Sequence, residues 1–249
     1  MHKFFTSPDL IVDSSARILG DDVKHIYKVL RLNEGEIVKL NDCNGNEFLA
    51  NITNITKTEV ELEIIEKLDI DNESGVEITL FQGLPKAQKM DLIVQKGTEL
   101  GIKEFIPVLT KRVDIKLKGE FKKLDRLNRI ALEAAKQSKR SIIPKVMEPI
   151  EFEELIKGIK NYDLIVVPYE NKDNFGVKKL VSEIKDKDSI KTIGIVIGPE
   201  GGFEESEIET LEKNNAKIIT LGSRILRTET AGFTATSLIQ YEFGDLGGI

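Results

Sequence analysis

The first 70 residues alternate apolar and polar positions with a period of two. The alternation is clearest from Glu36 to Asn41, from Glu47 to Ile52 and from Glu59 to Ile65. This period is typical of strands that bury only one face. Asn44-Gly45, between the first two segments, has the chemistry of a hairpin turn. Short strands joined by such turns predict a small β-barrel or sandwich.

One helical pattern precedes these strands, in the segment DDVKHIYKVLRL at 21–32. Helical spacing places four apolar side chains on one face of this segment: Val23, Ile26, Val29 and Leu30. We therefore expect one short helix packed on the small β-domain by that face.

Beyond the polar, turn-rich stretch at 68–75 the pattern changes to strands separated by helices. Apolar strands are predicted at 76–84, 103–110, 162–169, 192–198 and 217–222, with helices at 86–101 and 119–140 between the early ones. Continuously apolar strands are typical of parallel sheets covered on both faces. The second part is therefore predicted to be an α/β domain. The predicted domains are 1–72 and 73–249.

The composition excludes several classes of protein. The chain has 249 residues, and no apolar run approaches the roughly 20 residues that span a bilayer. The start, MHKFFTSPDL, lacks the apolar core of a signal peptide. Cys43 has no second cysteine to pair with, which fits a reducing, cytoplasmic location. One cysteine with His2 and His25 cannot form a Cys/His zinc cluster, so no metal is expected.

The charge is unevenly distributed along the chain. The formal net charge is −6, yet 111–145 contains 12 Lys and Arg residues against 4 Asp and Glu, a net charge of +8. A concentrated basic stretch on an acidic protein is the pattern expected for contact with a polyanion. A solvated helix face gives the same pattern more often, and the sequence leaves both interpretations open.

Three loops follow the late apolar strands: PYENKDNFG, GPEGGFEESE and GSRILRTETAG. In parallel sheets, ligands bind at the carboxyl ends of the strands, so these loops are the candidates for a site. Neither a dinucleotide fingerprint nor a phosphate-binding P-loop is present. The acids at the end of the second loop, Glu204, Glu205 and Glu207, favour the start of a helix and disfavour a phosphate ligand.

The third loop brings two arginines to the start of a helix. Thr228 is the expected N-cap of that helix. Arg224 and Arg227 lie just before it and are costly to desolvate without partners. They either pair with the acids Glu200 and Glu229 or face a substrate.

Four segments together are similar to one family: KAQKMDLIVQKGTELGI, RIALEAAKQSKRSIIPKV, IGPEGGFEESE and LGSRILRTETA. In this order they resemble the RsmE-type branch of the SPOUT methyltransferases. These enzymes methylate N3 of a uridine in 16S rRNA with S-adenosylmethionine. The N-terminal VKHIYKVLRLNEGEIVKLND also resembles the family's opening segment, so the resemblance covers nearly the whole chain.

The resemblance implies a fold and a cofactor site. It implies a PUA-like β-barrel followed by a SPOUT domain with a C-terminal trefoil knot, in a homodimer that binds 16S rRNA of the small ribosomal subunit. The cofactor would be held by ten residues of the three loops: Pro168, Tyr169, Glu170, Ile197, Gly198, Gly202, Leu221, Gly222, Ile225 and Leu226.

Three residues are candidates for the chemistry. Methyl transfer to N3 requires alignment and stabilisation of negative charge on the uracil carbonyls. We assign the stabilisation of this negative charge to Arg227, with Arg224 as the alternative candidate. Glu229 is the nearest candidate base, although a helix-start acid paired with an arginine is the more common explanation of such a residue.

Six basic residues are candidates for binding RNA: His25, Arg31, Arg112, Lys136, Lys139 and Arg140. A packing role explains His25 equally well. Where the family usually has Ser or Thr, this chain has Glu204, which puts the start of the following helix in doubt. Two other functions stay open: a non-catalytic RNA-binding protein, and a SPOUT enzyme acting on tRNA.

Overall fold

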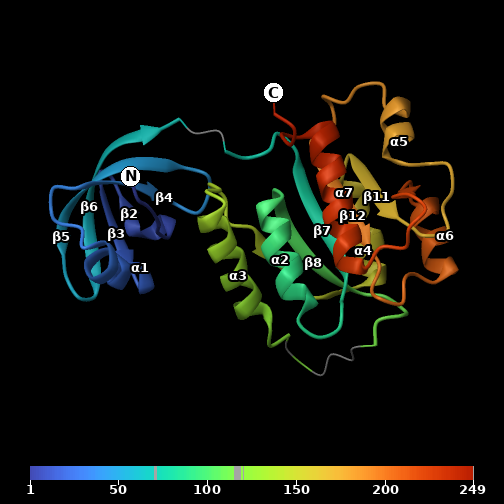
Figure 1. The fold of residues 1–249 in the computed structure, drawn as a ribbon, viewed down its shortest axis with the longest axis horizontal. Coiled ribbons are helices and arrows are strands. Elements are labelled where there is room, and N and C mark those ends of the chain that lie inside the picture. The colour runs from blue at the N-terminus through green and yellow to red at the C-terminus, as the bar shows by residue number, and fades with distance from the viewer. Residues whose placement is uncertain (70–71, 115–118, 120, 249) are drawn as a thin grey trace. The chain divides into compact units, whose positions relative to one another are not determined.

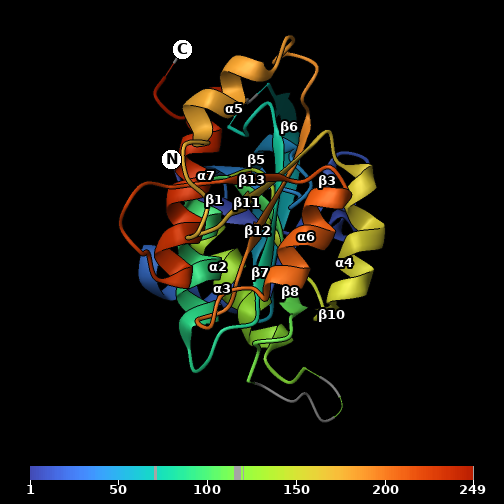
Figure 2. The same cartoon turned by 90° about the vertical axis from the view of Figure 1, so that its right-hand side faces the viewer.

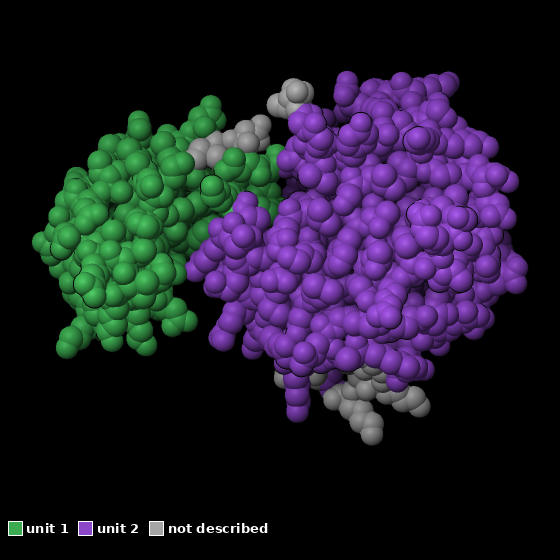
Figure 3. All heavy atoms as spheres, viewed as in Figure 1, with its two compact units in different colours: residues 1–73, 139–143 green, residues 74–138, 144–249 purple. Residues whose placement is uncertain are grey.

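The computed structural model describes residues 1–69, 72–114, 119 and 121–248 (Figure 1). It divides into two compact units, coloured separately in Figure 3. Unit 1 consists of Met1–Glu73 and Lys139–Ile143, and unit 2 consists of Ser74–Ser138 and Pro144–Ile249. The chain therefore passes from one unit to the other three times.

Unit 1 contains a mixed sheet of six strands in the order β1-β4-β5-β6-β3-β2. Its strands are β1 (Lys3–Phe5), β2 (Ile11–Val12), β3 (Ser15–Leu19), β4 (Ile37–Asn41), β5 (Glu47–Ile55) and β6 (Glu59–Leu68). Strand β1 pairs with β4 in parallel and the other pairs are antiparallel. The three strands predicted from the period of two, β4 to β6, are confirmed. The first three strands were not predicted: β1 and β2 have only three and two residues, whereas β3 does alternate buried and exposed positions.

The helical segment of unit 1 differs from its prediction. A 3-10 turn, η1 (Pro8–Leu10), precedes it, and the segment itself is divided into α1 (Asp21–Lys24) and a π-helical stretch, η2 (His25–Leu30). Val23 and Ile26 are buried as expected, but Val29 is 67% exposed. A π-helix bonds i to i+5 and has a wider turn than an α-helix. This change of winding accounts for the outward position of Val29, which α-helical spacing did not predict.

A half-buried carboxylate, that of Glu73, joins the short segment Lys139–Ile143 to the rest of unit 1. Glu73 Oε2 accepts a 2.6 Å hydrogen bond from Arg140 Nη2. Glu73 Oε1 accepts the N–H groups of Ser141 at 2.8 Å and Ile142 at 3.0 Å. The carbonyl of Ser141 in turn accepts the N–H of Gly45 at 3.1 Å. The segment lies inside the predicted domain 73–249, whereas these contacts group it with the first unit.

Unit 2 contains a parallel sheet in the order β10-β8-β7-β12-β11-β13, with β9 also paired to β8. Its strands are β7 (Glu77–Gly83), β8 (Ile102–Leu109), β9 (Lys145–Val146), β10 (Ile150–Glu151), β11 (Leu164–Pro168), β12 (Thr192–Ile197) and β13 (Lys217–Ile219). The continuous apolar runs therefore form a parallel sheet as predicted. Their order in space does not follow the chain.

Helices cover both faces of this sheet, as Figure 2 shows for α2, α3 and α7 on one side and α4 and α6 on the other. The helices are α2 (Lys89–Glu99), α3 (Leu124–Gln137), α4 (Phe152–Gly158), the 3-10 turn η3 (Ile159–Asn161), α5 (Val177–Glu183), α6 (Glu205–Lys213) and α7 (Thr228–Phe243). Each face has its own apolar core: Leu127 and Ile239 belong to the first, and Leu155 and Leu211 to the second. The long helix predicted at 119–140 corresponds to α3, which begins at Leu124. Residue 120 of the predicted range lies outside the described part.

Candidate active site

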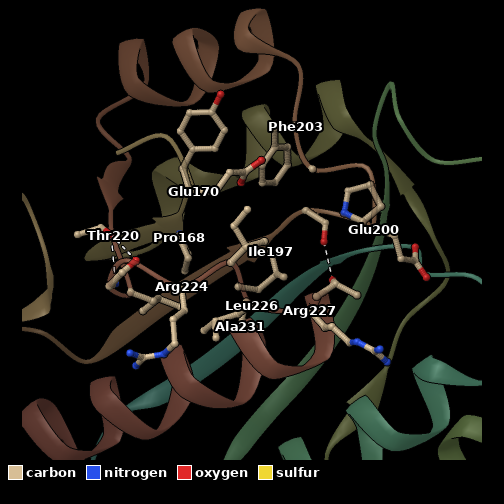
Figure 4. A pocket seen from close by; sticks show the side chains of 18 of the residues that line it. Pro168, Glu170, Ile197, Glu200, Phe203, Thr220, Arg224, Leu226, Arg227 and Ala231 are labelled. Carbon is tan, nitrogen blue, oxygen red and sulfur yellow. Dashed lines mark hydrogen bonds between the residues drawn. The ribbon is translucent and has the colours of Figure 1, made fainter. Parts of the chain in front are cut away.

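A cavity of about 330 Å³ lies at the carboxyl ends of β11, β12 and β13, beside the start of α7 (Figure 4). These strands are neighbours in the sheet, so their three following loops meet there. All ten residues that the resemblance assigns to a cofactor line this cavity: Pro168, Tyr169, Glu170, Ile197, Gly198, Gly202, Leu221, Gly222, Ile225 and Leu226.

Sequence reasoning missed several other lining residues: Lys89, Pro199, Glu200, Phe203, Thr220, Thr228 and Ala231. Most of them lie inside the three predicted loops, so the sequence located the right segments, but these residues were not among those assigned to the cofactor. Lys89 is different, because it comes from α2, more than 70 residues before the first loop. Only its place in the KAQKMD segment of the family resemblance pointed to it.

Thr228 joins the start of α7 to the floor of the cavity. Its hydroxyl donates a 2.6 Å hydrogen bond to the carbonyl of Gly198, which follows β12. The same hydroxyl accepts a 2.8 Å hydrogen bond from Nε2 of Gln82, a fully buried residue of β7. Because Gln82 supplies the hydrogen on one side, the hydroxyl hydrogen is directed at Gly198. Three elements are thus tied together by one side chain.

This arrangement corrects the predicted cap of α7. The N-cap is Arg227, with extended backbone, and Thr228 is the first helical residue. A threonine caps a helix by turning its hydroxyl back to the N–H groups of the first turn. Here that hydroxyl is occupied by Gly198 and Gln82. The tertiary contact therefore replaces the local one.

The glycine-rich loop passes close to neighbouring side chains at two positions. Gly202 has a φ of +67°, and a Cβ there would meet Oε1 of Glu170 at 2.9 Å. A Cβ on Gly198 would lie 3.2 Å from the ring of Phe203. Both positions line the cavity. At Gly202 glycine is favoured because other residues avoid this left-handed conformation, and at Gly198 because a side chain would crowd the Phe203 ring.

Glu204 begins α6, contrary to the doubt raised by its residue type. It is the N-cap of the helix and forms a capping box with Glu207, whose Oε2 accepts the N–H of Glu204 at 2.8 Å. Arg112 supports this start, donating from Nε to Glu204 Oε1 at 2.8 Å and from Nη1 to the carbonyl of Gly201 at 2.9 Å. The hydrogen bond from Arg112 to the Glu204 carboxylate, together with the charge of Arg112, lowers the pKa of Glu204. Arg112, an RNA candidate, therefore holds the glycine-rich loop.

The acids near the cavity pair with a lysine rather than with the arginines. Lys89 Nζ lies 3.0 Å from Glu200 Oε1 and 3.7 Å from Glu229 Oε2. Arg224 and Arg227 line the cavity, and within the described ranges neither has a hydrogen-bond or ion-pair partner. The pairing of these arginines with Glu200 or Glu229, one of the two predicted alternatives, is therefore wrong. Lys89 belongs to a distant segment of the chain, so its position beside these acids could not be predicted from the sequence around the loop.

Glu229 is placed beside the cavity rather than in its lining. Its Oε2 is buried and, among the residues that the structure describes, has no hydrogen-bond partner. Its nearest cation is Lys89, at 3.7 Å. The carboxylate thus keeps an unused acceptor close to the arginines of the third loop.

The other five RNA candidates lie in different environments. His25 and Arg31 are exposed on unit 1, at the two ends of η2, and His25 has no place in the core. Lys139 is exposed, whereas Arg140 is only 6% exposed and is paired with the half-buried carboxylate of unit 1. Lys136 lies 3.8 Å from Glu133, its neighbour on α3. The burial of Arg140 favours a structural role for it.

The described residues include no group of three or more His, Cys, Asp or Glu side chains that is placed to bind a metal ion. Within the same residues, no helix combines the length and the apolar character required to cross a bilayer.

Two family models match the chain. A model described as an RNA methyltransferase domain matches residues 72–240, and one described as an RNA methyltransferase PUA domain matches residues 18–65. The cavity lies within the residues matched by the first model.

Similar proteins are known from several bacteria. The chain is 38% identical over 231 residues to the ribosomal RNA small subunit methyltransferase E of Bacillus subtilis, covering 90% of this chain and 89% of that protein. A crystal structure of the protein of that name from Neisseria gonorrhoeae, bound to S-adenosyl methionine, is 31% identical with a TM-score of 0.84 and covers 99% of both chains. A putative methyltransferase from Legionella pneumophila, also in complex with S-adenosyl methionine, is 27% identical with a TM-score of 0.83 and covers 98% of both chains.

Proposed function

The chain belongs to the RNA methyltransferase family whose members include ribosomal RNA small subunit methyltransferase E, and we propose that it methylates N3 of a uridine in 16S rRNA. The methyl donor is S-adenosylmethionine. The observation that carries this proposal is the cavity at the carboxyl ends of β11, β12 and β13, where ten residues of three separate loops meet. Carboxyl ends of parallel strands are where such sheets bind ligands.

The residues of the cavity fit this cofactor. Ile197, Leu221 and Leu226 supply apolar surface for a flat base, and the loops supply backbone groups for its polar edge. The carboxylate of Glu170 lies in the cavity lining beside Gly202, and because Gly202 has no side chain, the carboxylate faces its backbone directly. A carboxylate there suits a ligand that carries positive charge and disfavours a phosphate. When bound, S-adenosylmethionine supplies the methyl group and a sulfonium leaving group.

The protein's own contribution is orientation and charge. The Thr228 hydrogen bond fixes the floor of the cavity at Gly198, so the loop backbone is positioned before any ligand arrives. Arg227, exposed at the start of α7, steadies the negative charge that develops on the uracil carbonyls. Arg224 is the rival for this role, because it lines the same cavity and is equally unpaired within the described residues.

Proton removal from N3 has one nearby candidate. Glu229 Oε2 has no hydrogen-bond partner among the described residues, so it retains the capacity to accept a proton. Glu229 is thus the base of the proposal.

The family implies further properties that belong to the same proposal. Residues 1–72 form an RNA-binding PUA-like barrel, and residues 73–249 form a SPOUT domain with a C-terminal trefoil knot. The protein acts as a homodimer in the cytoplasm on the small ribosomal subunit. Exposed Leu238 and Tyr241 of α7 and Leu92 of α2 offer apolar surface for the second copy.

One experiment tests the proposal against its alternatives. The protein is incubated with methyl-labelled S-adenosylmethionine and with either undermethylated small ribosomal subunits or tRNA, and the modified nucleotide is then mapped. Label at N3 of a single 16S uridine is the expected result. Label in tRNA instead would identify a different SPOUT substrate. Titration calorimetry that detects no binding of S-adenosylmethionine would favour a non-catalytic RNA-binding protein.

A further inference from the structure

Lys89 connects three segments at the edge of the cavity. It is the first residue of α2, Glu200 lies in the glycine-rich loop after β12, and Glu229 lies in the first turn of α7. Its Nζ is 3.0 Å from one carboxylate and 3.7 Å from the other. One cation thus faces two anions, so the cluster carries a net charge of about −1 at neutral pH.

The two arginines of the third loop do not take part in this cluster, although they are near it. Arg227 precedes Glu229 by two residues and lines the same cavity as Glu200. Figure 4 shows the Arg227 and Glu200 side chains extending to the same side of the cavity. A guanidinium forms stronger, two-pronged bonds with a carboxylate than an ammonium does. The structure nevertheless gives both acids to the lysine and leaves Arg224 and Arg227 unpaired within the described residues.

Glu200 is held firmly in this arrangement. Its Oε1 also accepts the backbone N–H of Lys86 at 3.0 Å. Burial raises the pKa of Glu200, but the hydrogen bonds from Lys89 and from Lys86 N–H outweigh this effect, and the pKa lies below its ordinary value. Glu229 Oε2 has no hydrogen bond within the described residues, so the ammonium of Lys89 is the group that balances its negative charge. Lys89 is therefore the cation that compensates both carboxylates beside the cavity.

We propose that Lys89 is a positioning residue for RNA recognition, which holds Glu200 and Glu229 away from Arg227 and Arg224 and so leaves both arginines available to the RNA. This inference rests on the proposed function, because it takes the rim of this cavity to be where the RNA enters. Uncompensated carboxylates at the rim would repel phosphate groups and would also compete for the arginines. Lys89 prevents both effects without touching the RNA itself.

The test is a double-mutant cycle on RNA binding. Affinity for transcribed 16S rRNA is measured for the wild type, Lys89→Met, Glu200→Gln and the double variant, since glutamine keeps the acceptor for Lys86 N–H. Lys89→Met is expected to weaken binding by about tenfold, and Glu200→Gln to improve binding more in the Lys89→Met background than in the wild type. Lys89→Arg, which keeps the charge, is expected to bind RNA within about threefold of the wild type.

Additive effects of Lys89→Met and Glu200→Gln would overturn the inference, because they would indicate that Lys89 contacts RNA phosphate directly. Affinity for S-adenosylmethionine, measured by calorimetry, is the second readout. An equal loss of affinity for S-adenosylmethionine and RNA in Lys89→Met would also overturn it, because that result indicates general damage to the cavity. A wild type that neither binds S-adenosylmethionine nor methylates 16S rRNA would instead refute the proposed function.

Discussion

The hydroxyl of Thr228 donates a 2.6 Å hydrogen bond to the carbonyl of Gly198, across 30 residues of chain. The bond links the first turn of α7 to the backbone that follows β12. Its direction is set by Gln82, whose amide occupies the acceptor side of the same hydroxyl. Since Gly198 and Thr228 both line the cavity, the position of one cavity wall depends on this contact.

Replacing Thr228 with valine keeps the shape of the side chain and removes both hydrogen bonds. We expect affinity for S-adenosylmethionine to fall by about tenfold, the equivalent of one or two net hydrogen bonds. Calorimetry measures it directly. Thr228→Ser retains the hydroxyl and should bind within about threefold of the wild type. Equal affinities of the valine variant and the wild type would show that the cavity floor does not need this bond.

Arg227 and Arg224 can be separated by their effects on turnover. Loss of a group that stabilises charge only in the transition state lowers kcat by about 100-fold or more. We expect Arg227→Ala to do so and Arg224→Ala to act mainly on KM for RNA. Steady-state kinetics with small ribosomal subunits measure both constants. The reverse pattern would transfer the role to Arg224, and wild-type rates for both variants would remove the arginines from the chemistry.

Lys136 and Lys139 are the exposed or partly exposed cations at the end of the basic segment, and Arg140 is excluded from this test by its burial. Reversing both lysines to glutamate should weaken RNA binding and reduce its salt dependence. Each lost phosphate contact lowers the slope of log affinity against log salt by about 0.7 to 0.9. An unchanged slope would assign the two lysines to a solvated helix face. Lys178→Glu with Lys179→Glu, on α5, is the matched control for net charge.

The Glu73–Arg140 pair predicts acid sensitivity of the fold. Burial raises the pKa of Glu73, but hydrogen bonds from Arg140 and from two backbone N–H groups outweigh it and lower the pKa below its ordinary value. Its contribution to stability is therefore complete above the unfolded-state pKa and is lost as the pH falls through the lower folded-state value. Chemical denaturation between about pH 3 and pH 7 should show this loss in the wild type and not in Glu73→Gln.

The same pair gives a prediction at neutral pH. Glu73→Ala removes the carboxylate that accepts hydrogen bonds from Arg140 and from the N–H groups of Ser141 and Ile142, which costs about 3 kcal/mol of unfolding free energy. The double variant Glu73→Leu with Arg140→Met removes both charges and should lose less than the single variant. A double variant that is less stable than Glu73→Ala would contradict this account.

The site was predictable where it depends on local pattern. Apolar runs gave the strands, the turn residues gave the loops, and parallel strands bring their following loops to one edge. These patterns brought the three loops together but did not select residues within them, and the ten residues that line one cavity came from the family resemblance. The strand order β12-β11-β13 was not readable from the chain.

Contacts between distant segments were not predictable. Local rules made Thr228 an N-cap and offered pairing of the arginines with Glu200 or Glu229 as one of two alternatives. Instead Gln82 bonds Thr228 from 146 residues away, and Lys89 pairs with Glu200 and Glu229 from 111 and 140 residues away. Residue type also misled at Glu204, where a glutamate forms the capping box expected of serine or threonine. In each case a tertiary neighbour decides between two locally acceptable structures.

The short segment Lys139–Ile143 has a consequence for how this architecture can change. Because unit 1 is completed by residues from the middle of the chain, the first 73 residues are not a self-sufficient cassette. A gene fusion or recombination event that transplants them leaves Glu73 without Arg140 and without the N–H groups of Ser141 and Ile142. The two units must therefore be inherited together, and a swap between relatives would succeed only if it carried the inserted pentapeptide along.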